Sequence, residues 1–128
     1  MWLEKGIKIG KGEIMTLDMI IKELQLDVLT EKKDFSEIES SHGYVSDMLS
    51  CVMTGASQHS IWVTLQSHGN IVAVARLLDL SAIIITEGAQ PDQKTIDKAN
   101  EEGVSLLLSQ ENSFYIVGKL WELGLKDQ

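Results

Sequence analysis

Apolar residues recur at two spacings along the chain, and these spacings predict helices alternating with short strands. Leucine and isoleucine three and four residues apart favour a helix over residues 17–24, with Thr16 as a candidate N-cap. Runs rich in β-branched residues, such as 60–66 and 82–86, favour strands. Further helices are expected over 46–55, 70–80, 92–102 and 112–123, and further strands over 26–30, 44–45 and 104–108.

Capping and apolar residues define these helices further. The expected N-caps are Ser46, Asn70 or Ser67, Asp92, and Asn112 or Ser113, and Gly103 and Gly124 are expected to end the last two helices. The apolar residues of the second helix that we expect to point inward are Met48, Leu49, Val52 and Met53. In the last helix, residues at helical spacing are Phe114, Val117, Leu120 and Trp121.

The order of elements predicts the fold class. From residue 60 onward it reads strand, helix, strand, helix, strand, helix, with short connections. Right-handed crossovers would make these strands parallel and place helices on both faces of the sheet. The continuous apolar run 82–86 agrees, because a strand covered on both faces has no polar side. We therefore predict an α/β fold, a three-layer α/β/α arrangement with a mostly parallel central sheet of about four to five strands.

One domain is expected over residues 15–128, because the chain has a single proline and no linker or low-complexity tract. Residues 1–14 are interpreted as an N-terminal extension of doubtful status. The reason is that Met15 and the segment after it are typical of a natural protein start. The mass of the intact protein from its native source would decide this point.

Composition excludes several classes of partner. The chain has 128 residues, a hydrophobic fraction of 44% and a formal net charge of −8. The acidic balance argues against nucleic acid, whose binding depends on clustered cations, and no apolar run is long enough to cross a membrane. A single cysteine and the lack of a signal peptide predict a cytoplasmic location.

The helix over residues 70–80 is apolar almost all round, with Arg76 and Asp79 as its polar members. A helix of this kind must be covered on every side, and one sheet face covers only one side. Two covers are possible: a second subunit, or the helix over 17–24. We favour a homodimer, with this helix or the one over 46–54 in the contact.

Polar residues gather directly before that helix, in the sequence Gln66-Ser67-His68-Gly69-Asn70. They are either a ligand site at the carboxyl end of a strand and the start of a helix, or a cap that satisfies backbone groups. The loops 86–92 and 109–113 are expected at the same sheet edge. The candidate ligand-binding residues are Gln66, Ser67, His68, Asn70, Thr86, Gly88 and Ser109.

No catalytic or metal-binding pattern is recognisable. The three histidines and Cys51 are scattered, and the spacings CxxC, HxxxH and HExxH are absent. Cys51 lies among apolar residues of a helix and is expected to be buried and inert. The sequence predicts no catalytic residue, no metal and no cofactor.

Several segments resemble a DRTGG domain: GYVSDMLSCVM, IWVTLQSHGNIVAVARLLDLSAIIITEG, PDQKTIDKANEEGVSLL and SFYIVGKLWELG. The resemblance extends from Thr16 to Leu125 and implies a fold similar to the N-terminal domain of HPr kinase/phosphorylase. In the segment EIESSHG, where the motif that names the family should fall, only Gly43 matches cleanly. The chain also lacks the P-loop GxxxxGK[ST], so a kinase activity is not implied.

These observations lead to one functional hypothesis and one alternative. We expect a non-catalytic regulatory or ligand-sensing module that acts as a homodimer, with a nucleotide or phosphorylated metabolite as a candidate ligand. The alternative is an accessory subunit that docks on a larger redox or phosphotransfer enzyme.

Overall fold

A five-stranded sheet forms the middle layer of the computed structural model, which describes residues 14–127. The strands are β1 (Asp27–Val28), β2 (His42–Val45), β3 (Ser60–Thr64), β4 (Ala82–Ile85) and β5 (Leu106–Leu108). The helices are α1 (Leu17–Leu24), the 3₁₀ helix η2 (Phe35–Glu37), α2 (Leu49–Gly55), α3 (Asn70–Leu78), α4 (Gln93–Glu102) and α5 (Ser113–Leu123). The sheet order is β1-β5-β4-β3-β2, with β2 to β5 parallel and β1 antiparallel at one edge. The predicted α/β fold is confirmed.

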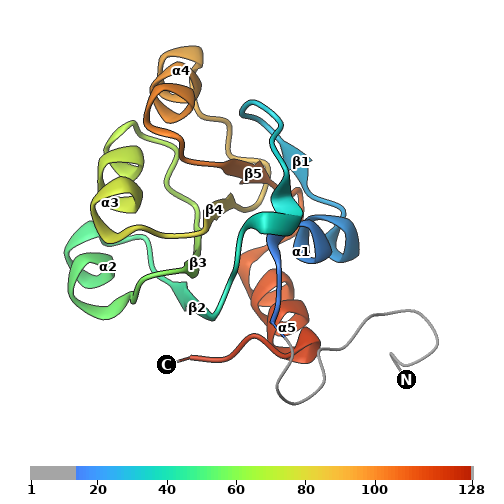
Figure 1. Cartoon of the computed structure of the whole chain (residues 1–128). Helices are drawn as coiled ribbons and strands as arrows, with labels where there is room; N and C mark the ends of the chain where they lie inside the picture. The colour runs from blue at the N-terminus through green and yellow to red at the C-terminus, as the bar shows by residue number, and fades with distance from the viewer. Residues whose placement is uncertain (1–13, 128) are drawn as a thin grey trace.

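Helices cover both faces of this sheet (Figure 1). Ile61 and Val63 of β3 pack with α1 and α5, whereas Trp62 between them packs with α2, α3 and α4. Alternate residues of a strand point to opposite faces. Because helices cover both faces here, all three side chains are at most 1% exposed. The apolar run 82–86 was correctly interpreted as a strand with no solvent face, since β4 is buried throughout.

Two helix starts were predicted correctly from single residues. The Asp92 carboxylate accepts a hydrogen bond from the backbone N–H of Thr95 at 2.9 Å, and the Asn112 side chain accepts from that of Tyr115 at 2.9 Å. Hydrogen bonding from the Thr95 side chain and, second, from the Thr95 backbone N–H lowers the pKa of Asp92 below its usual value of 3.8. Asp92 therefore caps α4 in its ionised form.

The cover of α3 differs from the prediction. Helices α2 and α4 pack against α3 on the same sheet face, whereas α1 packs on the opposite face. The alternative cover, the helix over 17–24, is therefore wrong. Most apolar residues of α3 are buried within the chain, and Leu77 is the large one left open, at 69% exposure. A second subunit is consequently not required to shelter α3.

Other helices expose apolar residues that sequence periodicity assigned to the interior. Met48 and Met53, expected to point inward beside α3, are 60% and 47% exposed. Cys51 is also exposed, so the expectation of a buried thiol is wrong. In α5, the core is formed by Ile116, Leu120 and Leu123, which leaves two residues of the predicted stripe largely in solvent: Phe114 and Trp121.

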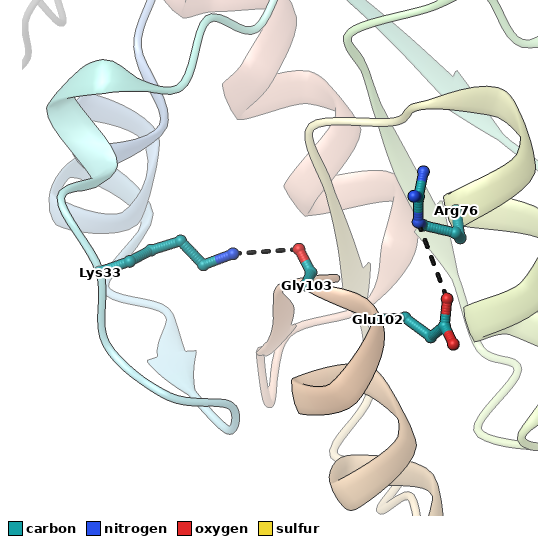
Figure 2. Close-up of polar contacts among 4 residues, drawn as sticks. All are labelled: Lys33, Arg76, Glu102 and Gly103. Atoms are coloured by element: carbon teal, nitrogen blue, oxygen red, sulfur yellow. Dashed lines mark hydrogen bonds and ion pairs between the residues drawn. The ribbon is translucent and has the colours of Figure 1, made fainter.

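The end of α4 is held by two long cationic side chains (Figure 2). The Lys33 ammonium donates to the carbonyl oxygen of Gly103 at 3.0 Å, and Arg76 Nε lies 3.7 Å from a Glu102 carboxylate oxygen. A cation at a helix carboxyl end is favourable because the terminal carbonyl groups carry partial negative charge. These contacts connect α4 to the loop after β1 and to α3.

The expectation of an extension over residues 1–14 falls almost wholly outside the described residues. Within the described range, none of the helices has the length and apolar character that crossing a bilayer would require.

Trp62→Phe tests the buried indole that joins β3 to the segment after β2. The Trp62 indole N–H donates to the Ser46 carbonyl oxygen at 2.8 Å, and the side chain is fully buried. The smaller ring leaves a void and an unpartnered carbonyl, so we expect a loss of about 2–4 kcal/mol in unfolding free energy by urea titration. The matched change Trp121→Phe, at a half-exposed position, should lose less than about 1 kcal/mol. Equal losses would contradict the assignment.

Asp92→Asn tests the ionised cap of α4 through pH. Because the pKa of Asp92 is lowered in the folded protein, its contribution is complete above the usual carboxyl pKa and is lost as pH falls through the folded value. Melting temperature measured from neutral to strongly acidic pH should therefore fall less steeply for the variant at the acidic end. Asp97→Asn is the control, because Asp97 accepts from the Gln93 side chain. A variant with the wild-type acid profile would show that the cap does not act through charge.

Candidate functional site

A cleft of about 810 Å³ opens where β3 and β4 end and the chain turns into α3 and α4. Parallel sheets commonly bind ligands at this edge, because the loops that leave neighbouring strands converge there. The residues that line the cleft are Asp47, Leu65, Gln66, Ser67, His68, Gly69, Gln90, Asp92, Lys94, Thr95 and Lys98.

The loop between β3 and α3, residues 65–69, forms one wall of the cleft. Here the His68 ring replaces the expected cap, since its Nδ1 accepts the backbone N–H of Asn70 at 3.2 Å. Gly69 occupies the N-cap position, and Asn70 is the first helical residue, so the prediction of Asn70 or Ser67 as the cap is wrong. In the neutral ring that accepts at Nδ1, the proton resides on Nε2, which is a hydrogen-bond donor.

Two carboxylates in the cleft are already engaged by the fold. Asp47 Oδ1 accepts from the Thr64 hydroxyl at 2.8 Å and from the backbone N–H of Leu65 at 2.7 Å. Asp92 is the α4 cap, with Thr95 as its donor. These hydrogen bonds orient both carboxylates toward backbone and side-chain donors of the protein.

Two lysines supply the opposite charge. Lys94 and Lys98 are four residues apart in α4, so they project from the same face of that helix into the cleft. Both are exposed, and within residues 14–127 neither has an ion-pair partner at 4 Å or less. The cleft therefore holds two lysines without a close ion-pair partner and two carboxylates whose positions are fixed by hydrogen bonds.

The structure divides the seven predicted ligand-binding residues into two groups. Gln66, Ser67 and His68 line the cleft, and Asn70 is exposed directly beside them. The other three residues lie behind it in contacts between loops: the Thr86 and Ser113 hydroxyl oxygens are 2.7 Å apart, Gly88 N–H donates to the Ser109 carbonyl, and Ser109 Oγ accepts from Glu111 N–H. The structure does not bring Thr86, Gly88 or Ser109 to the cleft.

Six polar residues of the cleft were not among the predicted ligand-binding residues: Asp47, Gln90, Asp92, Lys94, Thr95 and Lys98. Gln90 and Asp92 belong to the loop 86–92, which was expected at this edge. A signal for the lysines was available, because their spacing of four places them on one face of the helix that follows β4. For Asp47 no local signal existed, since it reaches the cleft through hydrogen bonds to β3 and the residue after it.

Other groups with reactive side chains lie apart from the cleft. Within the described part of the chain, no three His, Cys, Asp or Glu residues come close enough to hold a metal ion.

The segment Glu37–Gly43, where the resemblance places the family motif, leads from η2 into β2 and does not line the cleft. In that segment, the buried Ser40 Oγ and His42 Nδ1 have no hydrogen-bond partner among residues 14–127.

Comparison with a solved structure supports the architecture. The CBS and DRTGG domains of the regulatory region of a Clostridium perfringens pyrophosphatase, complexed with the activator diadenosine tetraphosphate, align with a TM-score of 0.65 and 19% identity. The alignment covers 80% of this chain and 44% of that chain, so our chain spans less than half of the neighbour's length. At this identity the likeness shows a shared fold.

Comparison at the level of families is more direct. Comparison with curated proteins gave no match. The DRTGG domain family matches residues 19–123, which include every strand of the sheet and nearly all of α1 to α5. Because this match covers most of the chain, the protein belongs to the DRTGG domain family.

Proposed function

We propose that this protein is a ligand-sensing regulatory module without catalytic activity, and that its cleft binds a nucleotide or another phosphorylated small molecule. The observation that carries the proposal is the pair of exposed lysines in the cleft. Lys94 and Lys98 have no ion pair at 4 Å or less within the described residues, whereas the carboxylates of Asp47 and Asp92 are turned toward donors of the protein.

The start of α3 adds to this preference for an anion. The dipole of a helix favours negative charge at its start. The first backbone N–H groups of α3 are bonded to His68 and Gly69, and the lysines of α4 line the same cleft, so a phosphate group there would meet the lysine ammonium groups beside the dipole of α3. The volume of about 810 Å³ falls within the range of pockets that hold small molecules, roughly 300–1,000 Å³.

The solved neighbour supports a regulatory role for this chain. It is a regulatory region that contains a DRTGG domain, and it was solved with a nucleotide activator. A module of this kind acts by binding its ligand differently in two states of an assembly. We propose that the assembly here is a homodimer.

Binding of ATP, AMP and diadenosine tetraphosphate, measured by calorimetry with unphosphorylated adenosine as the comparison, tests this function. We expect the double variant Lys94→Ala, Lys98→Ala to bind phosphorylated ligands with an affinity lower by about tenfold or more. The reason is that hydrogen bonds to charged groups contribute about 1.5–3 kcal/mol each. Affinity should also fall as salt is added.

The matched control is Lys22→Ala, Lys32→Ala, which removes the same charge from exposed positions that do not line the cleft. Its affinity should stay within about twofold of the wild type. Equal losses in both double variants would show that net charge, and not the cleft, sets the affinity. Failure of the wild type to bind any of the phosphorylated probes would refute the proposed ligand class.

A further inference from the structure

One flank of α5 presents an apolar ridge to solvent. Phe114 is 89% exposed and Trp121 is 50% exposed, and their spacing of seven residues places them on the same side of the helix. Gly118 lies between them on that side, and Val117 adjoins it. The ridge is defined as Phe114, Val117, Gly118 and Trp121, and Val117 forms its border with the core, against which it is partly packed.

An apolar groove lies beside this ridge. It has a volume of about 160 Å³, and Val45, Val63, Leu120 and Leu125 line it together with Val117 and Trp121 of the ridge. The groove therefore lies between α5, the edge strand β2 and the residues that follow α5, elements that Figure 1 shows side by side. A cavity of about 150 Å³ is large enough to accept a benzene ring.

Gly118 provides an independent observation. A glycine inside a helix is less stable than alanine by roughly 0.5–1 kcal/mol. A Cβ atom built at Gly118 meets nothing within 4 Å, so packing within residues 14–127 does not explain the absence of a side chain. A flat position between two protruding aromatic residues allows another backbone to approach α5 closely.

The exposed apolar area on this flank is comparable with the apolar area that each partner buries in a stable dimer. Aromatic side chains present about 150–250 Å² each, so the exposed fractions of Phe114 and Trp121 amount to roughly 200–350 Å². A standard interface buries about 800 Å² on each partner, of which a little over half, about 450 Å², is apolar. Val45, at 51% exposure, and the walls of the groove contribute further area.

We propose that a second copy of this chain binds here, with Phe114 of each copy entering the groove of the other. A twofold contact requires a surface that is complementary to itself. This flank meets the requirement, because it carries both a protruding ring and a hollow of matching size. Two of its charged neighbours have partners within the chain, since Lys119 pairs with Glu122 at 3.6 Å and Lys126 Nζ lies 4.3 Å from the centre of the Trp121 ring. Asp127 also lines the groove. The inference rests on the homodimer of the proposed function and specifies its interface.

Sedimentation of the full chain over a range of concentrations tests the interface. We expect a wild-type dimer, and a dissociation constant raised about tenfold or more by Phe114→Ala, as for a central aromatic residue of an interface. Gly118→Arg should have a similar effect, because its side chain would hold the partner away. Both Phe114 and Gly118 are exposed, so neither change disturbs the core. Circular dichroism would verify that both variants remain folded.

Tyr115→Ala is the matched control. Tyr115 is also an exposed aromatic residue of α5, at 46%, but it lies about 100° around the helix from Phe114 and does not line the groove. Its dissociation constant should stay within about twofold of the wild type. Equal weakening by Tyr115→Ala would overturn the assignment of the contact to this flank.

Two results would overturn the proposal in different ways. A wild-type chain that stays monomeric at high micromolar concentration would exclude a second copy as the occupant and leave the flank to a different protein. A wild-type dimer that is unaffected by Phe114→Ala and Gly118→Arg would place self-association elsewhere. Calorimetry of the same variants with ATP reports on the cleft separately, since neither residue lines it.

Discussion

The parallel pairing of β2 to β5, of which β3, β4 and β5 are fully buried, is the constraint on which the other features depend. Trp62 pairs with Ile83 and Ile84 with Leu107 in the same direction, so the carboxyl ends of β2 to β5 lie at one edge. The three connections between these strands cross the sheet as α2, α3 and α4, all on one face, and α1 and α5 cover the other face. The loops that begin these crossings converge at the carboxyl edge, and the cleft forms between two of them. Its position follows from the topology, whatever side chains line it.

The chemistry of the cleft follows from the hydrogen bonds that hold its loops. Asp92 must cap α4, and Asp47 must hold the start of the loop after β3, so both carboxylates have partners. A sum of formal charges over the lining residues would describe the cleft as nearly neutral. Lys94 and Lys98 have no ion pair at 4 Å or less within the described residues, so their ammonium groups can turn toward a ligand. Hydrogen bonds within the protein thus fix the two carboxylates in place and leave the two lysine side chains free to reorient.

Local patterns predicted most of the fold, because its strands and caps are local features. The run 82–86, the cap Asp92 and the left-handed Gly103 needed no tertiary information. The orientation of α5 could not be predicted, since its residues are apolar on two sides and only packing decides that Ile116 faces inward and Phe114 outward. The same limit applied to the site. Gln66 to His68 were found beside a strand end, whereas Asp47 reaches the cleft only through tertiary contacts.

The cleft and the proposed self-association surface are joined by a short rigid segment. Val45 lines the groove, and Asp47, two residues later, lines the cleft. Between them, the Ser46 carbonyl accepts from the Trp62 indole, and Asp47 accepts from Thr64 and Leu65, so β3 holds the segment at both positions. A ligand can change self-association only if it binds monomer and dimer with different affinity. In a free loop, changes of backbone conformation would absorb a displacement of Asp47. The segment from Val45 to Asp47 is held by hydrogen bonds, so more of such a displacement reaches Val45.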